Sequence, residues 1–165
     1  MIKALLDTNV LLDFLKQREY YAQAAGILDL AVDREFKAYA SAHEITTLAY
    51  FMEKDEIFPG EFRKKLSELL SVIQILPVDQ GILEKAIQSR ITDYEDAVLE
   101  AVSLKNSVEI IVTRNMKDFA HSKVRVMNSF RFLEMIEKKP PGDMVKEPTP
   151  SYRTRPRRRA KKKQS

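Results

Sequence analysis

Short apolar runs alternate along the chain with longer segments whose apolar residues recur at helical spacing. The runs predict buried strands at residues 2–6, 36–40, 72–78, 109–113 and 124–127. The longer segments predict helices at residues 9–16, 20–34, 42–54, 59–71, 80–89, 93–105 and 129–138. We expect Thr8 to cap the first of these helices, and Pro59 to lie in the first turn of the fourth.

This alternation of strands and helices fixes the expected fold class. Strands that are joined by helices run parallel, and the helices then cover both faces of the sheet. We therefore predict an α/β protein, a three-layer α/β/α sandwich with a central, mainly parallel sheet of four to five strands. In such sheets, sites form at the carboxyl ends of the strands.

The composition is that of a folded domain without disulfides. Of the 165 residues, 44% are hydrophobic and 32% are charged, and none is cysteine. The absence of cysteine excludes disulfides, thiolate zinc sites and cysteine nucleophiles. The apolar runs are far shorter than the roughly 18 residues that a membrane span requires. The N-terminus does not resemble a signal peptide, because an acid follows the first short apolar run. We expect a cytoplasmic protein with no membrane partner.

The net charge of +4 conceals two segments of opposite sign. Residues 1–137 carry 17 Lys/Arg and 22 acids, whereas residues 138–165 carry 11 Lys/Arg and 2 acids. We predict one domain over residues 1–138 and a flexible basic tail over residues 139–165. The tail either is solvated without a specific task or tethers RNA through its phosphates. The candidate RNA-binding side chains are Arg155, Arg157, Arg158, Arg159, Lys161, Lys162 and Lys163.

Acidic side chains lie at the boundaries of four predicted elements. They are Asp7, Glu44, Asp96 and Asp118. Each has a local explanation: Asp7 can cap a helix, Glu44 completes a capping box with Ser41, Asp96 suits a helix N-terminus, and Asp118 can shape a turn. Taken together, carboxylates that converge at the ends of parallel strands repel one another and require a compensating charge. Mg²⁺ and Mn²⁺ prefer oxygen ligands, so the pattern indicates a divalent-metal site and phosphodiester hydrolysis.

Four segments resemble the blocks of the PIN domain, and most closely those of VapC-type ribonucleases of toxin–antitoxin systems. The segments are LLDTNVLLD (5–13), SAHEITTL (41–48), DYEDAVLEAVS (93–103) and IVTRNMKDF (111–119), and the resemblance covers roughly residues 2–137. It implies a Mg²⁺- or Mn²⁺-dependent ribonuclease whose catalytic and metal-binding residues are Asp7, Glu44, Asp96 and Asp118. It further implies supporting roles for Thr8, Asn9, Thr113 and Asn115. The implied partners are an RNA substrate, a cognate antitoxin and a second copy of the chain.

The residues themselves leave several alternatives open. Asp93 lies three positions before Asp96 and is either an additional metal ligand or only a helix cap. Asp13 reads as a solvated helix residue. Tyr20 and Tyr21 either stack on bases or pack inward. The alternative function is a non-catalytic PIN scaffold that binds RNA or protein.

Overall fold

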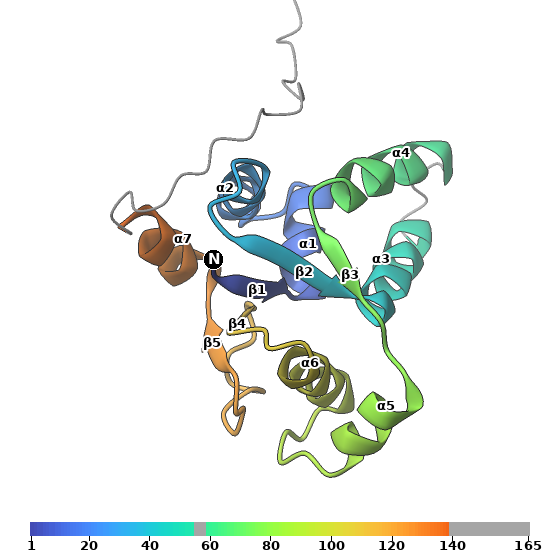
Figure 1. Cartoon of the computed structure of the whole chain (residues 1–165). Coiled ribbons are helices and arrows are strands. Elements are labelled where there is room, and N and C mark those ends of the chain that lie inside the picture. The colour runs from blue at the N-terminus through green and yellow to red at the C-terminus, as the bar shows by residue number, and fades with distance from the viewer. Residues whose placement is uncertain (55–58, 139–165) are drawn as a thin grey trace, which may run out of the picture.

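The protein contains a five-stranded parallel sheet with helices on both faces. The computed structural model describes residues 1–54 and 59–138 (Figure 1). Its strands are β1 (Lys3–Leu6), β2 (Lys37–Ser41), β3 (Gln74–Leu76), β4 (Ile110–Val112) and β5 (Arg125–Met127). Its helices are α1 (Thr8–Leu15), α2 (Tyr21–Val32), α3 (Ala42–Lys54), α4 (Pro59–Leu70), α5 (Gln80–Ile87), α6 (Tyr94–Lys105) and α7 (Ser129–Glu137). The predicted fold class is confirmed.

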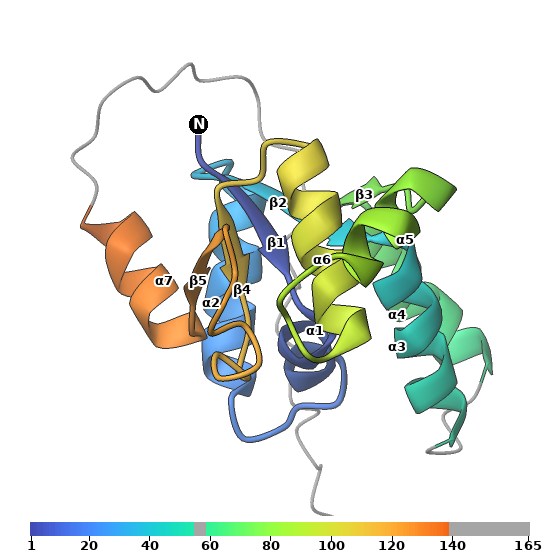
Figure 2. The ribbon, with the colours of Figure 1, turned by 90° about the horizontal axis from the view of Figure 1, so that it is seen from below.

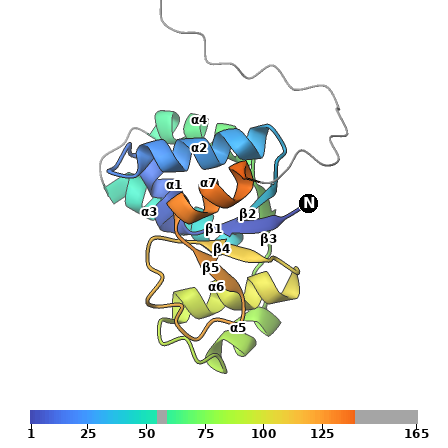
Figure 3. The same cartoon turned by 90° about the vertical axis from the view of Figure 1, so that its left-hand side faces the viewer.

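Side chains of β1 alternate between two hydrophobic cores, one on each face of the sheet. Ala4 and Leu6 belong to the core under α1, α2, α3, α4 and α7, whereas Leu5 belongs to the core under α5 and α6. Figure 3 shows these two helical layers on opposite sides of the strands. Leu5 is in register with Tyr39 of β2 and Ile111 of β4, and both of these side chains also face α5 and α6. Because alternate side chains of β1 face opposite sides of the sheet, both faces are apolar and each is covered by a layer of helices.

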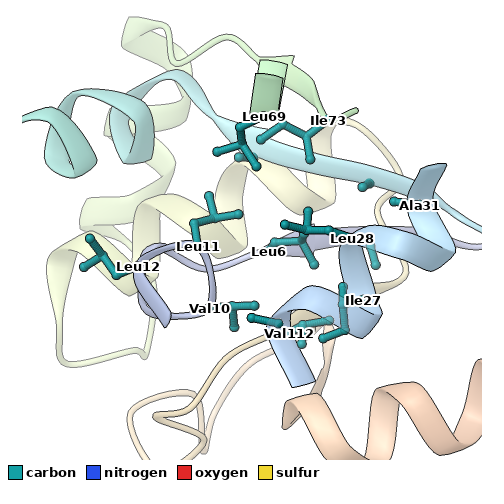
Figure 4. Close-up of a cluster of buried hydrophobic side chains, with 14 of the residues drawn as sticks. Leu6, Val10, Leu11, Leu12, Ile27, Leu28, Ala31, Leu69, Ile73 and Val112 are labelled. Carbon is teal, nitrogen blue, oxygen red and sulfur yellow. The ribbon is translucent and has the colours of Figure 1, made fainter. Parts of the chain in front are cut away.

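Buried side chains fix β1 and α1 on either side of Asp7. Leu6 and Val112 pack with Val10 of α1 and Ile27 of α2 (Figure 4), and all four are at most 2% exposed. Burial of each such side chain contributes roughly 1.5–3 kcal/mol to the free energy of folding. The backbone on both sides of Asp7 is consequently anchored in the hydrophobic core.

The strand order places a switch point between β1 and β4. The order across the sheet is β3-β2-β1-β4-β5, so the chain moves outward from β1 first in one direction and then in the other. The pairing continues past the strand ends, because Asp7 N donates to Val112 O at 3.0 Å and Thr113 N donates to Met127 O at 3.0 Å. Ligands of doubly wound sheets bind at such a switch point, beyond the carboxyl ends of the strands.

The start of α1 differs from the prediction. Thr8 does not cap the helix but is its first residue, and Asp7 takes the N-cap position with an extended backbone. The predicted tail, with its seven candidate RNA-binding residues, lies outside the described residues. Within residues 1–54 and 59–138, no helix is long and apolar enough to cross a bilayer.

Candidate metal centre

The Asp7 carboxylate at the end of β1 accepts a hydrogen bond from Thr113, the residue that follows β4. Its side chain accepts no capping hydrogen bond, although the residue stands at the N-cap of α1. Instead, Thr113 Oγ1 donates to Asp7 Oδ2 at 2.6 Å. Burial raises the pKa of Asp7, and the Thr113 hydroxyl and the neighbouring amide groups of Asn9 oppose this shift only in part. The buried carboxylate of Asp7 therefore lies at the switch point, directly after β1.

Thr113 and Asn115 connect the first predicted acid to the fourth. Thr113 is fully buried, and its Oγ1 also accepts a hydrogen bond from Asn115 N at 3.0 Å. The side-chain amide of Asn115 in turn donates to Asp118 Oδ2. A continuous path of hydrogen bonds thus runs from Asp7 through Thr113 and Asn115 to Asp118, which is exposed. Both predicted supporting residues on this segment contact a predicted ligand.

Glu44 uses one carboxylate oxygen as a helix cap and leaves the other without a partner. Ser41 N donates to Glu44 Oε2 at 2.6 Å and Glu44 N donates to Ser41 Oγ at 3.2 Å, which forms the predicted capping box. Glu44 Oε1 is buried and has no hydrogen-bond partner within the described residues. Burial raises the pKa of Glu44 well above its usual range, and the negative charge of Asp7 raises it further. Capping and metal binding are therefore compatible roles for this side chain.

Asp96 lies among the other acids at the N-terminus of α6. Burial raises its pKa to about 7, and the charges of Asp7, Asp93, Asp118 and Glu95 add to this shift. Asp93 is the N-cap of α6, where its Oδ1 accepts from Asp96 N at 3.1 Å. Of the two open readings of Asp93, the capping role is present in the structure.

Glu95 is a member of the acidic cluster that the sequence analysis did not single out. Its negative charge raises the pKa of both Asp7 and Asp96. Its Oε1 also lies 3.2 Å from His43 Nε2, so it links α6 to α3. The available signal was its position in the first turn of α6, next to Asp96.

Asp13 is not a solvated helix residue, and this prediction is wrong. The residue is fully buried, and Arg114 donates to its Oδ1 at 2.9 Å. The guanidinium of Arg114 also lies over the ring of Tyr20, 4.5 Å from the centroid. A buried carboxylate requires such a partner, and here the segment that follows β4 provides it.

The Arg114→Ala variant should have a free energy of unfolding about 1–3 kcal/mol lower than that of the wild type, because it leaves the Asp13 carboxylate buried without a cation. Urea denaturation measures this loss. The matched control is the double variant Asp13→Leu/Arg114→Ala, which removes both charges and should recover part of the stability. Equal losses in the single and double variants would show that the unpaired Asp13 charge is not the cause of the lost stability.

The residues at the switch point fit a divalent cation. Within residues 1–54 and 59–138, no three acidic or histidine side chains already lie in a metal-binding geometry. The candidate donor atoms are nevertheless all oxygens, and the buried Glu44 Oε1 has no hydrogen-bond partner among these residues. Burial raises the pKa values of Asp7, Glu44 and Asp96, and the charges of neighbouring acids raise them further. Hard cations such as Mg²⁺ and Mn²⁺ prefer this donor set and would neutralise the repulsion.

Comparisons with known proteins agree with this architecture. A family model described as PIN domain matches residues 3–117. No curated protein sequence matches the chain significantly.

Several solved structures share the fold. A toxin–antitoxin complex from Klebsiella pneumoniae contains a chain that is 25% identical, with a TM-score of 0.58; the match covers 76% of this chain and 97% of that chain. VapC20 of Mycobacterium tuberculosis, a sarcin–ricin loop cleaving toxin, is 14% identical, with a TM-score of 0.56 and coverages of 74% and 98%. PAE2754 from Pyrobaculum aerophilum is 16% identical, with a TM-score of 0.60 and coverages of 84% and 91%.

Proposed function

The chain belongs to the PIN domain family, and we propose that it is a Mg²⁺- or Mn²⁺-dependent endoribonuclease that hydrolyses RNA phosphodiester bonds. Its catalytic and metal-binding side chains in this proposal are Asp7, Glu44, Asp96 and Asp118. The observation that carries the proposal is the buried oxygen Glu44 Oε1, which has no hydrogen-bond partner among the described residues. It belongs to a carboxylate whose pKa is raised by burial and, to a smaller extent, by the charge of Asp7. A cation bound here would give Glu44 Oε1 a partner and would offset the repulsion between the Glu44 and Asp7 carboxylates.

Each residue of the centre has a task that follows from its contacts. The cation would be held by Asp7, Glu44, Asp96 and Asp118. Thr113 fixes the orientation of the Asp7 carboxylate through its 2.6 Å hydrogen bond. Asn115 orients Asp118, and Thr8 and Asn9 form the first turn of α1 beside Asp7. A bound divalent cation would supply an activated water and charge stabilisation for phosphodiester hydrolysis.

Cleavage of RNA by the purified chain tests this function. We expect cleavage in Mg²⁺ or Mn²⁺, none after chelation, and recovery when the metal is returned. The Asp118→Asn variant, prepared in the same way, serves as the control for contaminating nucleases. Cleavage that is insensitive to chelation, or equal in wild type and variant, would contradict the proposal.

The alternative function is a non-catalytic PIN scaffold that binds RNA or protein. The observation in its favour is that no three candidate ligands in the described part of the chain already form a metal-binding geometry. A chain that binds RNA with unchanged affinity in the presence and absence of divalent ions, and cleaves none, would support the scaffold.

We propose a cognate antitoxin as the protein partner, and a homodimer as the active assembly in the cytoplasm. The 25% identity to a chain of a toxin–antitoxin complex supports the antitoxin. A small DNA-binding protein encoded next to this chain, which co-purifies with it and inhibits cleavage, is the expected finding. If the adjacent reading frames encode no such protein, the toxin assignment loses its support while the nuclease assignment does not.

Deletion of residues 140–165 should weaken RNA binding without a matching loss of the cleavage rate at saturating RNA. Each phosphate contact contributes about 0.7 to the log–log salt slope for single strands, so the seven Lys/Arg at 155–163 would together contribute about five. Binding titrations across salt concentrations measure this slope. A Gly/Ser tail of equal length is the matched control. If the truncated chain keeps the wild-type affinity and salt slope, the tail is not a tether.

A further inference from the structure

A cavity of about 470 Å³ lies beside the metal centre, at the carboxyl ends of β1, β4 and β5. Its lining residues include two amides, two aromatic rings and one cation: Asn9, Asn115, Tyr20, Phe130 and Arg114. Asn9 follows Asp7 in the chain by two residues, and Asn115 hydrogen-bonds Asp118. The cavity therefore shares a wall with the acidic cluster, and its volume is in the range of small-molecule sites, roughly 300–1,000 Å³.

Two aromatic rings from distant parts of the chain form one side of the cavity. The rings of Tyr20 and Phe130 meet edge to face, with their centroids 6.1 Å apart at an interplanar angle of 88°. Phe130 is 53% exposed, although it lies in the first turn of α7, whose Phe132 and Ile136 are buried in the core. An aromatic ring that remains accessible beside a cavity can stack on a planar ligand.

The guanidinium of Arg114 is built into the cavity wall. It is held between the buried Asp13 carboxylate at 2.9 Å and the ring of Tyr20 at 4.5 Å. Among the described residues, only Asp13 accepts a hydrogen bond from it. Since a guanidinium has five N–H donors in one plane, donors remain for a ligand. Asp13 acts on the cavity through Arg114 and is therefore a positioning residue.

We propose that this cavity binds the nucleobase of a substrate nucleotide next to the scissile phosphate, an inference that rests on the proposed ribonuclease function. The base stacks on the exposed ring of Phe130 and contacts the neighbouring ring of Tyr20, while Arg114 and Asn9 hydrogen-bond the edge of the base. Proteins recognise single-stranded RNA by this combination of aromatic stacking and polar contacts to base edges. The accessible ring of Phe130, together with the planar cation of Arg114, favours a base over a peptide segment.

Titration of nucleosides into the chain, followed by NMR in the presence of a chelator, tests the cavity independently of cleavage. We expect adenosine, guanosine, cytidine or uridine to shift the resonances of Arg114, Asn115 and Phe130, and ribose to shift none of them. Tyr20→Ala and Phe130→Ala should weaken the binding by about 5- to 150-fold, the effect of losing a base–aromatic stack. Tyr50→Ala is the matched control, because Tyr50 is 61% exposed on α3 and does not line the cavity.

The cleavage assay supplies a second readout. Tyr20→Ala should raise KM for RNA by a similar factor and leave kcat near the wild-type value, which a general loss of structure would not do. The proposal is overturned if no nucleoside shifts these resonances, or if both aromatic variants bind nucleosides as the wild type does. It is also overturned if the tripeptide Gly-Glu-Gly shifts them and nucleosides do not. A chain that binds nucleosides here and cleaves no RNA would contradict the nuclease function and retain the base-binding cavity.

Discussion

The Asp7→Asn variant should lose RNA cleavage by more than about 100-fold while it retains its fold. Loss of an outer-shell partner of a metal ligand costs roughly 10- to 100-fold, and removal of a ligand charge should exceed that. Asparagine has nearly the same shape and keeps an oxygen that can accept the hydrogen bond from Thr113. Because burial raises the pKa of Asp7, the ionised form is disfavoured in the folded chain, and the neutral amide should leave the metal-free protein at least as stable.

Thermal unfolding with and without Mn²⁺ separates this effect from misfolding. At a Mn²⁺ concentration 100 times the Kd, binding should stabilise the wild type by about 2.7 kcal/mol. For a domain of this size, the corresponding rise in Tm is roughly 5–10 °C. The Asp7→Asn variant should show a normal Tm without metal and a much smaller rise with it. An equal rise in both proteins would exclude Asp7 from the metal centre.

The Glu44→Gln variant should also cleave RNA about 100-fold or more slowly, with little change in stability. Glutamine serves at the same position of a capping box, so the hydrogen bond from Ser41 N can persist. The negative charge of the carboxylate is lost, although Glu44 Oε1 has no hydrogen-bond partner among the described residues that would require it. The variant therefore separates the two roles that one side chain combines.

Comparison with Glu44→Ala completes this test. Alanine removes both the cap and the charge, so it should lower the free energy of unfolding by about 1 kcal/mol in addition to abolishing cleavage. Urea denaturation and a cleavage assay on the same preparations give both quantities. Wild-type cleavage by Glu44→Gln would restrict Glu44 to capping.

The fold could be predicted from the sequence because each element has a clear period. The strand residues Ile110 to Val112 form an uninterrupted apolar run, and helices lie on both faces of the resulting sheet. The start of α1 could not be placed to the residue. Thr8 and Asp7 both belong to residue types that are common helix caps, and their order in the sequence does not choose between them. In the structure Asp7 stands at the N-cap, and its side chain accepts a hydrogen bond from Thr113, 106 positions later.

Position in the sequence identified the acids at the ends of strands and helices, and it could not identify contacts between distant residues. Asp13 falls in a helical stretch where a polar residue normally faces solvent. Its partner Arg114 lies 101 positions later, on the turn after β4. Tyr20 and Phe130 are likewise far apart in the sequence, and they meet because α7, which follows β5, packs against α2 (Figure 2). The cavity could therefore be found only in the three-dimensional structure. The convergence of the acids could be predicted from the sequence, because they follow strands and begin helices of a parallel sheet.

Anomalous X-ray scattering from crystals of the wild-type chain soaked in Mn²⁺ tests the central claim most directly, because it locates the cation itself. We predict an anomalous peak at the carboxyl ends of β1 and β4, within about 2.0–2.3 Å of carboxylate oxygens that include Asp7. The same soak of Asp7→Asn crystals should show a much weaker peak. Absence of a peak in the wild type, or a peak bound by other residues alone, would contradict the assignment of these acids as a metal centre.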